Sequence, residues 1–349
     1  MSDNFPLRPG NKVFRPRRIK RFHLRRVLGI PAVFSAGYGN VGSSIYYALS
    51  LVALVALGAT PIALGIAGIL FIFTALTYAE GTAAIPEAGG SASFARHAFG
   101  DMAGFVAGWA LMLSYIVTIA ISAFTIPPYL GFFWEPLKND PVTGTLASVA
   151  IVIFLMLVNI VGIKETSVIN IGATVVDILT QISLVVIGFV TLFNPAVLVK
   201  RIVENWPEPG NLILGIAMAT IAYTGIETMS QMAEETKKPE RSVPRALIMM
   251  IVAVLVIFAG ISLVSLTAMP PQELATTWAR DPVAGIAYYI PIEIIRVVLK
   301  PLIAVLAATI LFIATNAGLI GISRLTFSQG QHKLVPQVLS KVHSKFKTP

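Results

Sequence analysis

Long apolar runs without a charged residue are the main pattern of this chain. An α-helix needs about 20 residues to cross about 30 Å of hydrocarbon, and each run is at least that long. Five runs contain no Asp, Glu, Lys or Arg, and they cover residues 27–79, 102–134, 141–163, 246–272 and 301–323. Two further runs, 168–199 and 211–230, contain one acid each. The pattern therefore predicts a bundle of membrane-spanning helices.

A turn signal, Gly58-Ala59-Thr60-Pro61, divides the first run into two spans, which gives eight predicted spans in all. They cover approximately residues 28–57, 61–80, 101–130, 144–162, 168–192, 211–230, 244–268 and 297–322. A ninth apolar piece, residues 283–292, is too short to cross and is predicted to be interfacial or re-entrant.

Composition supports this fold class, an all-α integral membrane protein. Of 349 residues, 56% are hydrophobic and 12% are charged, whereas soluble domains have about 25% charged residues. So few charges cannot cover a water-exposed surface. The chain has no cysteine, and its four histidines lack the paired spacing of a metal site. Phosphate-binding, dinucleotide-binding and nucleophile motifs are absent from the sequence, so we expect no enzyme activity, metal or cofactor.

The positions of the basic residues explain the net charge of +9. With a cytoplasmic N-terminus and eight alternating spans, only six of the 26 Lys and Arg residues lie on the outer side. This bias predicts a multi-pass protein of the plasma or inner membrane with both ends in the cytoplasm. We expect the Arg-rich stretch 15–26 to contact anionic lipids at the cytoplasmic face, and not nucleic acid.

The first and sixth spans are both interrupted. Residues 37–44 place three glycines and a polar cluster inside the first span. This favours either close packing through Gly39 and Ser43, or an unwound segment whose backbone finds partners in a cavity or ligand. The sixth span is interrupted at Ala222–Glu227 by glycine, hydroxyl groups and an acid. Because five spans precede it, a second unit starting there enters the membrane from the opposite side.

Paired interruptions in inverted halves indicate the substrate site of a secondary transporter. A half-helix that begins near Ser43 presents free N–H groups and suits a carboxylate, whereas one that ends near Tyr223 presents carbonyls and suits an ammonium group. An amino acid fits both. The predicted parts are a basic segment 1–27, a first five-helix repeat 28–192, the first three helices of an inverted repeat 211–322 and a basic segment 323–349.

Four ordered motifs resemble the amino acid-polyamine-organocation (APC) superfamily, the amino acid permease family in particular. They are Val41–Tyr46, in which the family usually has glycine where Ser44 stands, Ile85–Ser91, Ala222–Glu227 with Ala233–Pro244, and Ser323–Pro336. The resemblance implies the five-plus-five inverted-repeat fold of the leucine-transporter type and alternating-access transport of amino acids or related amines, often coupled to protons. It also implies two further helices in the second repeat, so we expect the chain to be C-terminally incomplete.

Carried over residue by residue, the resemblance assigns the substrate carboxylate to the backbone of residues 42–44. It assigns the ammonium group to the carbonyls of Ile221, Ala222 and Thr224, and it places Tyr223 near the ligand. The candidate substrate-binding residues are Gly39, Val41, Gly42, Ser43, Ser44, Ile45, Tyr115, Ile221, Ala222, Tyr223, Thr224 and Gly225. Tyr115 lies one helical turn from Thr118, and it either lines the cavity or serves packing.

Two acids lie inside predicted spans, where an acid costs about 2.5–3.5 kcal/mol on insertion scales. Asp177 either binds a coupling proton or cation, or forms a structural hydrogen bond to another helix. Glu227 is a gating or coupling acid by resemblance, and the alternative is a carboxylate that fixes the break by accepting from backbone N–H groups. The loop charges, which are either solvated or part of an inner gate, are Glu80, Glu87, Arg96, His97, Glu234, Glu235, Lys237, Lys238 and Arg241.

These observations favour a secondary active transporter of amino acids, coupled to protons or sodium. The first break has no clear acid beside it, and Tyr223 has apolar neighbours, which favours a neutral substrate. A membrane-embedded amino acid sensor, or a truncated permease that does not transport, is the alternative. An ion channel is a third reading, but it needs a continuous polar pore, whereas the polar residues here gather at two breaks.

Overall fold

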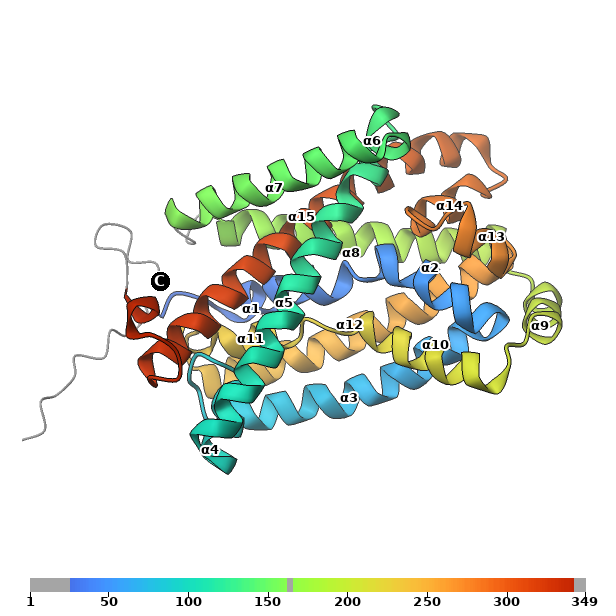
Figure 1. The fold of residues 1–349 in the computed structure, drawn as a ribbon. Helices are drawn as coiled ribbons and strands as arrows, with labels where there is room; N and C mark the ends of the chain where they lie inside the picture. Colours follow the sequence, from blue (N-terminus) through green and yellow to red (C-terminus); the bar gives the residue numbers. More distant parts are fainter. Residues whose placement is uncertain (1–25, 162–165, 342–349) are drawn as a thin grey trace, which may run out of the picture.

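The computed structural model describes residues 26–161 and 166–341, and over these residues the fold is all-helical with no named strand (Figure 1). Residues 1–25 of the basic segment 1–27, residues 342–349 of the basic segment 323–349, and Lys164 lie outside the described residues. Six helical stretches are long and apolar enough to cross a membrane. They are Ile30–Ala84, Asp101–Leu130, Pro141–Ile160, Asn170–Thr191, Pro239–Ala268 and Glu293–Gln331. The arrangement agrees with the all-α integral membrane fold class that the sequence predicts.

The first stretch contains two predicted spans, the predicted interruption of the first span and the predicted turn between the two. It is made of α1 (Ile30–Gly42), α2 (Ile45–Ala56), a 3-10 turn (Leu57–Ala59) and α3 (Thr60–Ala84). The turn lies at the predicted division. Gly58 donates its N–H to the Asn205 carbonyl at 2.9 Å, and a Cβ at Gly58 would lie 2.5 Å from the Arg201 carbonyl oxygen. The close approach of two backbones therefore requires glycine here.

The remaining helices follow the predicted spans, with short helices between them. They are α4 (Ser91–Phe99), α5 (Asp101–Leu130), α6 (Pro136–Asn139), α7 (Pro141–Val161), α8 (Thr166–Thr191), α9 (Pro195–Glu204), α10 (Pro209–Ile221), α11 (Glu227–Gln231), α12 (Pro239–Ala268), α13 (Pro271–Thr276), α14 (Pro282–Tyr288) and α15 (Glu293–Gln331), with 3-10 turns at Ala233–Glu235 and Gln337–Ser340. The first part of the apolar piece 283–292 lies in α14, whose Val283, Ile286 and Ala287 are buried against the bundle.

Helix α15 continues well past the predicted end at residue 322. The prediction stopped there because Arg324 is charged. In the structure the Arg324 side chain is buried, and its Nη2 lies 3.1 Å from Glu235 Oε1. Because this ion pair compensates the charge inside the protein, the helix continues to Gln331.

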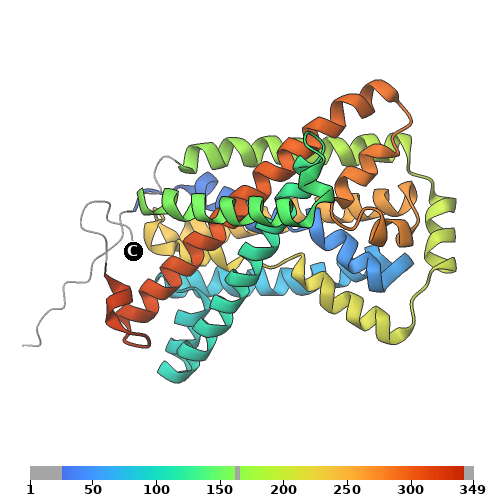
Figure 2. The same cartoon turned by 45° about the horizontal axis from the view of Figure 1, so that its top comes forward.

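Helices α1, α12 and α15 form the centre of the bundle, and α7 lies at its edge. Figures 1 and 2 show α15 running obliquely across the bundle, and α9 lying across the long helices at one end. Large apolar side chains such as Phe73, Leu113 and Leu157 are exposed on α3, α5 and α7. In hydrocarbon these faces contact lipid, so the polar residues that matter for function lie inside the bundle.

Candidate functional site

The first break is confirmed as a short interruption between α1 and α2 at Ser43 and Ser44. Both serines keep helical backbone angles, and the Ser44 N–H donates to the Val41 carbonyl at 3.1 Å. The Ser43 and Ser44 hydroxyls both donate to the Asn40 carbonyl, at 3.0 and 3.4 Å. The helix therefore tightens into a 3-10-like turn and does not unwind widely. The Ser44 N–H expected to be free for a ligand is paired in this conformation.

The second break lies between α10 and α11 and is longer, covering residues 222–226. The N–H groups of Ala222, Tyr223 and Thr224 each donate to the carbonyl three residues earlier, in α10, as in a 3-10 helix. The Ile221 carbonyl, predicted to meet an ammonium group, accepts from both the N–H and the hydroxyl of Thr224. Gly225 has φ +108°, a backbone conformation that favours glycine.

The two breaks meet through one side chain, Asn40 of α1. Its Nδ2 donates to the Thr228 hydroxyl at 2.9 Å and to the Gly225 carbonyl at 3.3 Å, although these residues are more than 180 positions apart in the sequence. Asn40 is only 1% exposed. A Cβ at Gly225 would lie 2.6 Å from Asn40 Cγ, so the two segments are in direct contact. Sequence reasoning missed Asn40 and Thr228, although an amide inside a glycine-rich apolar helix is a signal that could have identified Asn40.

Several polar atoms around this contact are buried without a hydrogen-bond partner in the described part of the chain. They are Asn40 Oδ1, Tyr115 Oη and both side-chain polar atoms of Gln231. The Tyr115 side chain on α5 lies next to Thr228 and Gln231 of α11, so the predicted site residue from the third span does approach the second break. A buried polar group without a partner costs about 1–3 kcal/mol. The region therefore has hydrogen-bonding capacity for a ligand or water.

Glu227 begins α11 and is 7% exposed. Its Oε2 accepts a hydrogen bond from the Gly225 N–H at 3.1 Å. This is the contact expected if the carboxylate holds the backbone of the break in its conformation. Tyr78 and Tyr115 also lie within its electrostatic reach. No basic side chain in the described residues forms an ion pair with Glu227, so its charge is compensated by hydrogen bonding alone.

Asp177 on α8 is 1% exposed and faces the first break. Its Oδ1 accepts from the Tyr46 hydroxyl at 2.8 Å, and its Oδ2 accepts from Gln181 Nε2 at 2.6 Å. Tyr46 lies in the first turn of α2. Asp177 therefore holds the half-helix that follows the break, and among the described residues it has no cationic partner.

The other predicted site residues are in the core. The Tyr223 ring turns toward α3 and α12, where its hydroxyl donates to the Leu64 carbonyl at 2.9 Å and its ring lies 5.1 Å from Phe71 and 5.3 Å from Phe258. Only the Tyr223 backbone stays at the break. A Cβ at Gly39 would lie 2.5 Å from Ile313 Cγ2 on α15, so this glycine also serves close packing. The apolar residues beside the first break, Val41 and Ile45, are fully buried.

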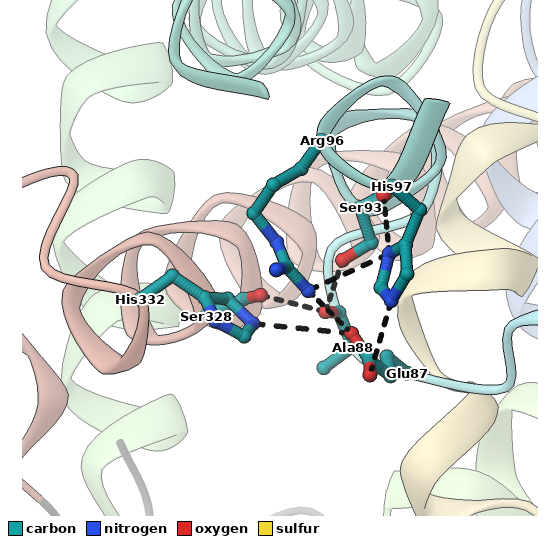
Figure 3. A network of polar contacts seen from close by, with 7 residues as sticks. All are labelled: Glu87, Ala88, Ser93, Arg96, His97, Ser328 and His332. Carbon is teal, nitrogen blue, oxygen red and sulfur yellow. Dashed lines mark hydrogen bonds and ion pairs between the residues drawn. The ribbon is translucent and has the colours of Figure 1, made fainter. Parts of the chain in front are cut away.

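A second polar network closes one end of the bundle, which we call the Glu87 end. Figure 3 shows Glu87, in the loop before α4, facing Arg96 at 3.1 Å and His97 and His332 at 3.9 Å each. The Ser328 hydroxyl of α15 donates to the Ala88 carbonyl at 2.7 Å. The buried Arg324–Glu235 pair lies at this end too. The charges predicted to lie in loops that are exposed and outside this network are Glu80, which lies in α3, Lys237, Lys238 and Arg241, which lies in α12.

Comparisons with known proteins agree with this architecture. Residues 28–349 match the family model described as amino acid permease. The chain is 26% identical to an uncharacterised transporter of Mycobacterium tuberculosis, over 93% of this chain and 70% of that protein. It is also 26% identical to two Bacillus subtilis proteins, the glutamate/serine transporter AimA and the branched-chain amino acid permease BcaP, over 93% of this chain and 63% and 71% of those proteins.

Proposed function

The chain belongs to the amino acid permease family, and from this premise we propose that it carries amino acids or related amines across the cell membrane by alternating access. One observation carries the proposal. The interruptions of two helices far apart in sequence meet at Asn40, beside buried polar atoms of Asn40, Tyr115 and Gln231 that have no hydrogen-bond partner among the described residues. Paired helix breaks inside a membrane-spanning bundle occur in secondary transporters, where they form the substrate site.

The proposed substrate site lies between the two breaks. The substrate carboxylate meets the backbone of residues 42–44, and the ammonium group meets the carbonyls of residues 221–224. Because Ser44 N–H and the Ile221 carbonyl are paired within the chain, substrate binding exchanges these internal hydrogen bonds for bonds to the ligand. The apolar neighbours of the breaks, Val41 and Ile45, favour a neutral side chain.

Asp177 and Glu227 are the proposed coupling and gating groups, with a proton as the favoured ion and sodium as the alternative. Both are buried acids without a cationic partner in the described residues. An acid in that position is stabilised by taking up a proton or binding a cation. Asp177 holds Tyr46 of α2, so a change in its charge changes the anchoring of the half-helix beside the substrate.

The proposed orientation places the Glu87 end in the cytoplasm. The exposed Lys237 and Lys238 lie just before α12 and the exposed Arg241 lies in its first turn, where they suit contact with anionic lipids. The opposite end, formed by α6, α9, α13 and α14, then faces outward.

The test is uptake of radiolabelled amino acids into proteoliposomes that contain the chain, with and without an inward proton or sodium gradient. Saturable uptake is expected, and Asn40→Ala is expected to lower it by about tenfold or more, because two buried hydrogen bonds of about 1 kcal/mol each are lost. Asn159→Ala is the matched control. It removes an amide hydrogen bond of 2.6 Å from α7, at the edge of the bundle, to Asn316 of α15, and should leave uptake within about threefold.

An amino acid sensor is the second candidate, and the closure of both ends of the bundle by ion pairs favours it. A sensor would bind amino acids without saturable flux. Binding measured by equilibrium dialysis in the same preparation, together with absence of uptake under both gradients, would replace the transport proposal with this one.

A further inference from the structure

Residues 269–292, which we call the lid segment, cover the end of the bundle opposite Glu87 (Figure 1). The segment contains α13 and α14 and connects α12 to α15. It lies outside the long apolar stretches, yet its apolar side chains Leu274, Val283 and Ile286 are all at most 1% exposed. The lid segment is therefore packed onto the bundle and is not a solvated loop.

One ion pair fastens the lid segment to the turn after α5. Lys138 Nζ of α6 lies 2.7 Å from Asp281 Oδ2, and the Asp281 side chain is 8% exposed. The neighbouring Arg280 donates to the Lys138 carbonyl at 2.9 Å, and Lys138 Nζ lies 5.3 Å from the centre of the Trp278 ring. Burial raises the pKa of the Asp281 carboxyl above its ordinary value, while the hydrogen bond and charge of Lys138 oppose that rise. The charged form of Asp281 therefore depends on Lys138.

The lid segment is also attached to α2, the half-helix that follows the first break. The Ser50 hydroxyl of α2 donates to the Ala279 carbonyl of the lid segment at 2.8 Å. Tyr129 of α5 also holds α2, because its hydroxyl donates to the Tyr46 carbonyl at 2.8 Å. Contacts therefore run without interruption from the Lys138–Asp281 pair to the helix that begins at the proposed substrate site.

We propose that Lys138 and Asp281 form a latch that holds the lid segment closed over α2, so that its release opens the bundle at this end. The role of the latch as an outer gate rests on the proposed transport function. The latch itself is a conformational property that can be measured without transport. Loss of Lys138 leaves the buried Asp281 carboxylate unpaired, and loss of the Asp281 charge removes the partner of the half-buried Lys138, so either change destabilises the closed conformation.

The absence of cysteine from the sequence makes a single-cysteine accessibility experiment possible. Ala287→Cys introduces a thiol on α14, at a position that is fully buried in the closed lid segment. The measurement is its rate of labelling by a membrane-impermeant thiol reagent in proteoliposomes. Lys138→Met and Asp281→Asn are each expected to raise this rate by about tenfold or more, whereas Lys138→Arg, which keeps the charge, should stay near the parent rate.

The double variant Lys138→Met/Asp281→Asn is expected to label no faster than the faster single variant, because both changes break the same contact. Lys200→Gln is the matched control. Lys200 pairs with Glu204 at 3.8 Å on the exposed surface of α9, so its loss should leave the labelling rate unchanged.

The latch is overturned if Asp281→Asn and Lys138→Met, both shown to be folded by size-exclusion chromatography, label at the parent rate. It is equally overturned if Lys200→Gln raises the rate as much as they do. Labelling that depends on Lys138 in a protein without uptake would retain the latch and reject the transport function. Saturable uptake together with a labelling rate that does not depend on Lys138 would retain the transport function and reject the latch.

Discussion

Replacing Gly225 with alanine tests whether the contact between the two breaks determines the conformation of the site. Gly225 has φ +108°, which L-residues rarely adopt. The added Cβ would also lie 2.6 Å from both Cγ and Nδ2 of Asn40. The side chain of Asn40 must then move, although its amide is bound to Thr228 and to Gly225 itself.

The expected cost follows from these two effects. Backbone strain at such a φ contributes about 1–3 kcal/mol. Loss of the two Asn40 hydrogen bonds adds about 1 kcal/mol each. The total of about 3–5 kcal/mol should lower the Tm of the purified protein by about 5–10 °C and abolish most of its uptake.

The assay is thermal unfolding in detergent together with uptake in proteoliposomes. Gly65→Ala is the control, because a Cβ at Gly65 on the exposed face of α3 meets no atom within 4 Å. It should stabilise the helix by up to about 1 kcal/mol. In Gly225→Ala/Asn40→Ala the clash is absent, so the double variant should lose less stability than the two single variants added together. The reasoning would be refuted if the Gly225→Ala variant had the same Tm and the same uptake rate as the Gly65→Ala control.

Three further outcomes are expected. Asp177→Asn should abolish stimulation by a proton gradient while leaving substrate binding within about threefold, and unchanged stimulation in uptake assays would count against a coupling role. Glu227→Gln should slow transport more than it weakens equilibrium binding, and an equal loss of both would exclude gating. Arg324→Met should cost about 3–5 kcal/mol in thermal unfolding, because Glu235 stays buried without its partner. The double variant Arg324→Met/Glu235→Gln should recover part of this loss, and the absence of any recovery would argue against the ion pair.

The sequence was sufficient to predict the class of fold and the positions of both helix breaks. Glycine and polar residues inside apolar spans are local signals, and the breaks at residues 43–44 and 222–226 lie where those signals occur. The division of the first run at Gly58 was predicted for the same reason. Proline and glycine act on the backbone of their own segment, so they can be interpreted without the partner segment.

Contacts between distant segments could not be predicted in this way. The bond from Asn40 to Thr228 depends on two helices that the sequence does not place side by side. The direction of the Tyr223 ring was missed because Leu64 supplies the acceptor on another helix. The extension of α15 was missed because Arg324 is neutralised by a residue from another loop. In each case the deciding atom belongs to a segment far away along the chain.

Helix α15 has a mechanical consequence through its length. Its 39 residues span about 58 Å, nearly twice the hydrocarbon thickness of a bilayer. One end packs against α14 of the lid segment, and the other carries Arg324 and Ser328. A rocking of about 5° about its midpoint would displace each end by about 2.5 Å, in opposite directions. A displacement of that size is enough to break the 3.1 Å hydrogen bond between Arg324 and Glu235. Because the two ends move in opposite directions, the same tilt of α15 can open the contacts at one end of the bundle while it tightens those at the other.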